Sequence, residues 1–160
     1  MEQAKLEIRA AFANRAAMYF HIFDEMRAQL GEARATDIMR RAIYARGVEH
    51  GKKYHDAVAA GDFASIGEMF VSGSACEGEL FEPSVDEVRE DGLVLRMTGC
   101  PLLQTWREMG ASERDADLMC EIAAAVDEGT WEGAGLDFSF RERLGQPGAT
   151  ACVLDIRRRG

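Results

Sequence analysis

The chain has 160 residues, enough for one domain with a buried core, and its 47% hydrophobic and 29% charged residues are ordinary proportions for a globular protein. A formal net charge of −9 argues against a protein that binds nucleic acid or an anionic membrane, because such a surface repels phosphate groups. No stretch has the apolar length of a signal peptide core or a membrane span, so we expect a cytoplasmic protein whose four cysteines are reduced.

The N-terminal part of the chain has the periodicity of a long helix. Apolar residues recur at steps of four and three from Phe12 through Ala16, Tyr19, Phe23 and Met26 to Leu30. Gly31 follows where a glycine often ends a helix.

A second helix is expected from about Thr36 to Ala60. In this helix Gly47 and Gly51 lie one turn apart and would let another backbone approach closely. A shorter helix is expected from Phe63 to Phe70.

The second half of the chain changes to the alternating pattern of strands. We expect a weak strand in residues 79–90, a hairpin turn at Asp91-Gly92, a strand at 93–97, helices at about 101–110 and 112–127, and strands at 136–141 and 152–156. The predicted fold class is α+β, with a helical N-terminal half packed on a small antiparallel sheet of about four strands with two inserted helices. We expect a single domain over residues 1–160, with a helical half at 1–72 and a sheet-containing half at 76–160.

Cys100 is the most informative residue for chemistry, because Pro101 follows it directly. Proline favours the first position of a helix, which makes Cys100 the expected N-cap. Unpaired backbone N–H groups and the helix dipole would then favour a thiolate, which can act as a nucleophile or a metal ligand. The alternative interpretation is a small buried residue that happens to cap a helix.

Cys120 and Asp127 are expected on one face of the next helix. Seven residues separate them, which is about 10 Å along a helix axis, so the two side chains could bracket a ligand. The alternative is a core thiol and a solvated carboxylate at the helix end, where the dipole disfavours negative charge.

Three further residues are candidates for contacts with a substrate. His55 lies on the apolar stripe of the second helix, where a hydrogen-bonded core histidine is the commoner outcome. Trp106 is expected in the core, with a smaller chance that its ring walls a pocket. Cys152 is expected on the inward face of the last strand, as a core residue or as a third sulfur for a metal.

Several of these segments together are similar to one family. The stretches CPLLQTW, LMCEIAAAVDEGTWEGAGLDFSF and ACVLDIRRR resemble the L-2-amino-thiazoline-4-carboxylic acid hydrolase family over roughly residues 93–158. The chain also looks somewhat like the small-molecule-binding 4-vinyl reductase domains. One departure is that Gly148-Ala149 stands where the family often has Gly-Asp before its last cysteine.

The resemblance implies a ring-opening hydrolase that cleaves a C–N bond of a cyclic amidine and gives an N-carbamoyl amino acid. Cys100, Cys120, Asp127 and Cys152 fall on recurring positions of the family. The preferred mechanism uses Cys100 as the nucleophile, Cys120 as a further catalytic group and Asp127 or His55 to move protons, with no cofactor.

Two other interpretations remain open from the sequence. In one, Cys100, Cys120 and Cys152 bind a zinc ion that activates water, a weaker choice because three thiolates make a poor Lewis acid. In the other, the protein is a non-catalytic small-molecule-binding or sensor domain. The expected partner is a small molecule, and a homo-oligomer formed through the N-terminal helix is compatible with each interpretation.

Overall fold

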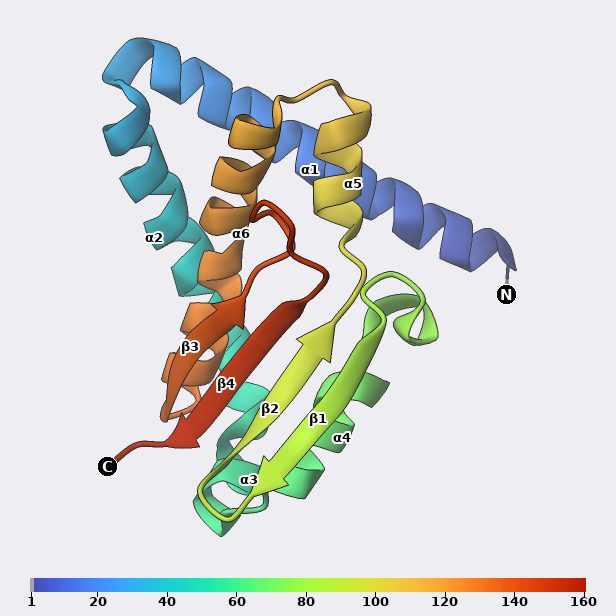
Figure 1. Ribbon diagram of the computed structural model, residues 1–160, viewed down its shortest axis with the longest axis vertical. Helices are drawn as coiled ribbons and strands as arrows, with labels where there is room; N and C mark the ends of the chain where they lie inside the picture. The colour runs from blue at the N-terminus through green and yellow to red at the C-terminus, as the bar shows by residue number, and fades with distance from the viewer. Residues whose placement is uncertain (1) are drawn as a thin grey trace.

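A computed structural model describes residues 2–160 and has the predicted α+β class (Figure 1). The helices are α1 (Glu2–Leu30), α2 (Glu32–Gly51), α3 (His55–Ala60), α4 (Phe63–Ser72), α5 (Pro101–Glu108) and α6 (Glu113–Gly133), with 3-10 turns at Lys52–Tyr54 and Ala75–Gly78. The strands are β1 (Pro83–Arg89), β2 (Gly92–Met97), β3 (Leu136–Glu142) and β4 (Cys152–Arg158). Among the described residues, no helix is both long enough and apolar enough to cross a membrane.

The four strands form one antiparallel sheet in the order β1-β2-β4-β3. The helices α5 and α6 are inserted between β2 and β3, as predicted. Figure 1 shows α3, α4 and the C-terminal end of α6 behind one face of the sheet. Leu93, Leu95, Leu154 and Ile156 are fully buried on that face, which explains the alternating apolar pattern.

Ion pairs stabilise the opposite face of the sheet. Asp155 is buried there, and its carboxylate accepts hydrogen bonds from Arg89 at 2.7 Å, Arg141 at 2.6 Å and Arg157 at 3.2 Å. Burial alone would raise the pKa of Asp155, but the three guanidinium groups outweigh it and hold the pKa well below its usual range.

Two predicted helix boundaries are wrong. The second helix begins four residues earlier than expected and is interrupted by the 3-10 turn at Lys52–Tyr54. The predicted loop after Asp127 is helical, because α6 continues to Gly133. Trp131 anchors this extension: its ring is fully buried and lies 4.8 Å from the ring of Tyr54, so tertiary packing overrides the glycines.

The predicted close approach at Gly47 and Gly51 is confirmed, and the partner is α6. A Cβ atom at Gly47 would lie 2.2 Å from the Val126 carbonyl oxygen, and one at Gly129 would lie 2.1 Å from the Tyr44 carbonyl oxygen. The two helices therefore touch backbone to backbone, which fixes the position of α6 in the fold.

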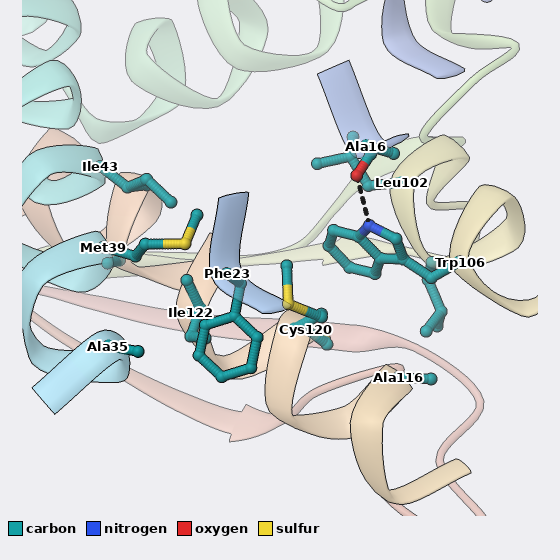
Figure 2. Packing of buried hydrophobic residues seen from close by; sticks show 13 residues of the cluster. Ala16, Phe23, Ala35, Met39, Ile43, Leu102, Trp106, Ala116, Cys120 and Ile122 are labelled. Carbon is teal, nitrogen blue, oxygen red and sulfur yellow. Dashed lines mark hydrogen bonds between the residues drawn. The ribbon is translucent and has the colours of Figure 1, made fainter. Parts of the chain in front are cut away.

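Buried side chains form two main clusters that α6 connects. The first lies between α1, α2, α5 and the N-terminal part of α6, and includes Phe23, Met39, Trp106, Met119 and Cys120 (Figure 2). The second lies between the sheet, α4 and the C-terminal part of α6, and includes Tyr54, Ile66 and Trp131. Cys100 packs at the edge of the first cluster and Cys152 at the edge of the second.

Candidate active site

Cys100 is the N-cap of α5, as predicted. Pro101 is the first residue of the helix, and the Cys100 Sγ accepts a hydrogen bond from the Leu103 backbone N–H at 3.5 Å. The sulfur therefore faces the N–H groups of the first turn.

The prediction that this position holds Cys100 as a thiolate is wrong for the free protein. Burial raises the pKa of the Cys100 thiol to about 11, and the hydrogen bond from Leu103 opposes this only in part. The desolvation of the charged sulfur outweighs the stabilisation by the backbone N–H groups of Leu103 and Leu102. Near neutral pH, Cys100 is a neutral thiol.

The loop after β3 brings the other two sulfurs toward Cys100. The Leu144 backbone N–H lies 3.4 Å from the Cys152 Sγ and donates a hydrogen bond to it. Gly145 packs on Cys120 so closely that a Cβ atom there would lie 2.9 Å from the Cys120 Sγ. Leu144 also lines a pocket together with Cys100. Residues 143–145 thus connect all three thiols.

Asp127 lies two turns before the end of α6, not at its end as expected, so the argument from the helix dipole does not apply to it. Its side chain is half-buried, and no hydrogen bond or ion pair within residues 2–160 engages its carboxylate. Burial, with a smaller contribution from the charge of Glu128, raises the pKa of Asp127 to about 7. A carboxyl group with this pKa can accept and return a proton at neutral pH.

Asp127 and the three thiols are electrostatic neighbours. Burial raises the pKa of Cys152 to about 12 against the Leu144 hydrogen bond, and negative charge on Cys120, Asp127 or Cys100 raises it further. The pKa of Cys120 is also raised by burial, although the nearby Arg143 guanidinium opposes this. Cys100, Cys120 and Asp127 thus lie close enough to Cys152 for their charges to act on its thiol.

The pocket beside Cys100 has a volume of about 310 Å³. This is at the lower end of the volumes of small-molecule sites. Its lining combines a thiol, an amide and charged groups with apolar surface, from Thr98, Cys100, Leu103, Gln104, Arg107, Glu108 and Leu144. Within residues 2–160, the side chain of Arg107 pairs only with the exposed Glu113. An exposed ion pair of this kind is weak, so the guanidinium is available to an anionic ligand.

Two predicted contact residues lie elsewhere. His55 is exposed, and its Nε2 is 3.0 Å from the carbonyl oxygen of Gly133, at the C-terminal end of α6. Thirteen residues of helix, about 20 Å, separate Gly133 from Cys120, and six residues, about 9 Å, separate it from Asp127. Trp106 is fully buried in the first cluster, and its Nε1 donates a hydrogen bond to the Ala16 carbonyl oxygen at 2.8 Å (Figure 2).

Sequence reasoning missed two residues beside the site. Arg143 is half-buried, forms an ion pair with Asp117 at 3.1 Å and faces Cys120. Tyr54 is buried, and its pKa is raised first by burial and then by the charge of Asp127. Neither carries a local motif: Tyr54 sits in a 3-10 turn that breaks the helical pattern, and Arg143 sits just past a strand.

The described residues do not fit the zinc interpretation. Within residues 2–160, no group of three or more His, Cys, Asp or Glu side chains is gathered closely enough to hold a metal ion. Cys100, Cys120 and Cys152 do not form such a set.

Comparison with known proteins identifies a family. The sequence model of the L-2-amino-thiazoline-4-carboxylic acid hydrolase family matches residues 11–155. It reaches into the helical half, beyond the segments that carry the resemblance. No curated protein and no solved structure matches the chain.

Proposed function

The chain belongs to the L-2-amino-thiazoline-4-carboxylic acid hydrolase family, and from this premise we propose that it is a hydrolase that opens a small cyclic amidine bearing a carboxylate. One observation carries the proposal: a thiol lines a pocket of suitable size, and it feels the charge of Asp127, an unpaired carboxyl group outside the pocket lining whose pKa is about 7.

Electrostatics favour an amidine as the substrate. A protonated amidine is a planar cation, and the carboxylate of Asp127 is a matching anion without a partner within the described chain. A bound cation also lowers the pKa of the thiols around it. Cys100, neutral in the free protein, thus becomes easier to ionise when the substrate is present.

The reaction proceeds in two displacements at the amidine carbon. In the first, Asp127 accepts the proton of the Cys100 thiol, and the sulfur adds to the amidine carbon. The ring sulfur then leaves and takes that proton, so the opened substrate stays attached to Cys100 as an isothiourea. In the second, water adds to the same carbon, and Asp127 transfers a proton from this water to the sulfur of Cys100. The bond between the carbon and the Cys100 sulfur breaks, which releases the carbamoyl product and restores the thiol.

The bond that breaks differs from the one the resemblance implied. In a 2-aminothiazoline, cleavage of the ring C–N bond leaves the carbamoyl group on sulfur. An N-carbamoyl product requires cleavage of the ring C–S bond. We propose C–S cleavage, because a thiol leaves more readily than an amine of much higher pKa. Product analysis by mass spectrometry and thiol reagent, after removal of the protein, distinguishes the two products.

The test compares two cysteine variants on 2-amino-thiazoline-4-carboxylate. Cys100→Ala is expected to lose turnover by at least about 10³-fold, because the nucleophile is gone. Cys76→Ala is the matched control, since Cys76 is buried against the Lys5 carbonyl oxygen and away from the site. Equal activity of the Cys100→Ala and Cys76→Ala proteins would exclude the covalent mechanism.

One observation favours a second candidate function. All three thiols have raised pKa values, as expected for a site that binds a small molecule without turning it over. A non-catalytic binding or sensor domain would be stabilised in a thermal-shift experiment by a ligand that is recovered unchanged. Time-dependent consumption of that ligand identifies the hydrolase instead.

A further inference from the structure

The helix α1 has a second apolar stripe that faces away from the rest of the protein. Its inward side holds the buried residues Ala16 and Phe23. On another side, Ile8, Met18 and Ile22 are 37%, 51% and 45% exposed. Figure 1 shows α1 lying along one edge of the molecule.

The outward stripe has the spacing of a coiled-coil seam. Steps of four and three connect eight positions, all exposed: Ala4, Ile8, Ala11, Arg15, Met18, Ile22, Glu25 and Gln29. Such a/d spacing is what a helix needs to pack along a second helix. A helix of 29 residues is about 40 Å long, enough for several turns of contact.

The charges of the stripe select the partner and its direction. Neither Arg15 nor Glu25 forms an ion pair within residues 2–160. Along the helix, Arg15 and Glu25 lie five residues before and after Phe20, and Met18 and Ile22 lie two residues before and after it. An antiparallel second copy centred there overlaps over residues 10–30 of α1, so Ala4 and Ile8 lie outside the contact. It sets Arg15 against the second copy's Glu25, and Met18 against the second copy's Ile22. A parallel copy would set Arg15 against Arg15 and Glu25 against Glu25, which like-charge repulsion disfavours.

We propose that the outward stripe of α1 binds a second copy of this chain as an antiparallel helix pair. The inference does not depend on the hydrolase function, because the stripe lies on α1 and the proposed catalytic groups lie at the start of α5 and on α6.

The test is a charge-swap series measured by sedimentation equilibrium, with the wild type expected at twice 17.7 kDa. Arg15→Glu and Glu25→Arg should each weaken the dimer about tenfold or more, since each puts two like-charged pairs at the seam. The double variant Arg15→Glu/Glu25→Arg should restore wild-type association. Because these residues are exposed, all three variants should keep the wild-type circular dichroism spectrum.

Each other outcome overturns the proposal. A wild-type protein that stays monomeric at high concentration excludes the dimer. Single variants that associate as tightly as the wild type exclude the antiparallel arrangement, because only that arrangement opposes residues 15 and 25. A double variant as weak as the single ones excludes the Arg15–Glu25 pairing.

Discussion

Single residues at this site show how burial competes with local hydrogen bonding. Cys100 has the N-cap position that usually favours a thiolate, yet burial raises its pKa to about 11. Asp127 experiences the same desolvation without an N–H donor, and its pKa rises to about 7. Under the proposed mechanism, the Cys100 thiol is neutral in the free protein and gives its proton to Asp127 only when substrate is bound.

The pKa of Asp127 has a measurable effect on stability. Between its unfolded pKa of 3.8 and about 7, the folded protein keeps a proton that the unfolded chain has lost. The free energy of unfolding should therefore fall as pH rises from about 4 to 7, and stay level above 7 as far as this group is concerned. The difference in pKa sets an upper limit of about 4 kcal/mol.

The variant Asp127→Asn removes this titration. We expect the variant to be more stable than the wild type by about 2 to 4 kcal/mol at pH 8, and nearly equal to it at pH 4. It should also be inactive under the proposed mechanism. Urea unfolding across this pH range measures the difference, with Glu121→Gln, an exposed site on the same helix, as the control. A constant gap between wild type and variant would show that Asp127 titrates normally.

Arg107 is expected to bind the carboxylate of the substrate. It lines the pocket with Cys100 and is the cation we assign to the substrate carboxylate. Arg107→Ala should raise KM about tenfold to a hundredfold with a small change in kcat, because the contact is made equally in the ground state and the transition state. Steady-state kinetics test this, with Arg34→Ala, an exposed arginine of α2, as the control. A fall in kcat at unchanged KM would contradict the assignment.

At the level of elements, the contact between α2 and α6 positions the site. Gly129 lies two residues after Asp127 and touches the backbone of α2. In a free helix, Gly129→Ala would gain about 1 kcal/mol of helix propensity. Here the added Cβ atom would meet the Tyr44 carbonyl oxygen at 2.1 Å, so the helices must separate.

We therefore expect Gly129→Ala to destabilise the protein by about 2 to 4 kcal/mol, opposite in sign to its propensity. Urea unfolding measures the effect. Glu121→Ala, an exposed substitution on α6, is the control and should be within about 0.5 kcal/mol of the wild type. A neutral or stabilised Gly129→Ala protein would mean that the two helices are not in backbone contact.

The fold could be predicted from the sequence where the apolar pattern is regular, and not where tight packing such as the contact between α2 and α6 decides the structure. Helices and strands with a regular apolar period were found near their true positions, since the period reports burial on one face. The end of α6 was missed because Gly129 and Gly133 read as loop signals, whereas tight packing requires them. The role of the cysteines stays a prediction. The loop at Leu144 and Gly145, which contacts Cys152 and Cys120, could not be predicted because it follows no periodic pattern.

At the scale of the whole molecule, α6 belongs to both buried clusters. Its residues Met119 and Cys120 pack in the first, and Trp131 and Ala134, at and just beyond its end, pack in the second. Neither cluster can lose its packing without exposing part of the same helix. We therefore expect the chain to unfold in one cooperative transition, as a single domain.

The two tryptophans make this testable, because Trp106 lies in the first cluster and Trp131 in the second. In Trp131→Phe the fluorescence reports only the first cluster, and in Trp106→Phe only the second. Because each substitution should destabilise the protein, the two signals are compared within the same variant and not between variants. In each variant, the midpoint of urea unfolding measured by fluorescence should coincide with the midpoint measured by circular dichroism. If one cluster melted first, fluorescence would precede circular dichroism in one variant and lag behind it in the other. The candidate site, which lies where the clusters meet, would then be lost before the rest of the protein unfolds.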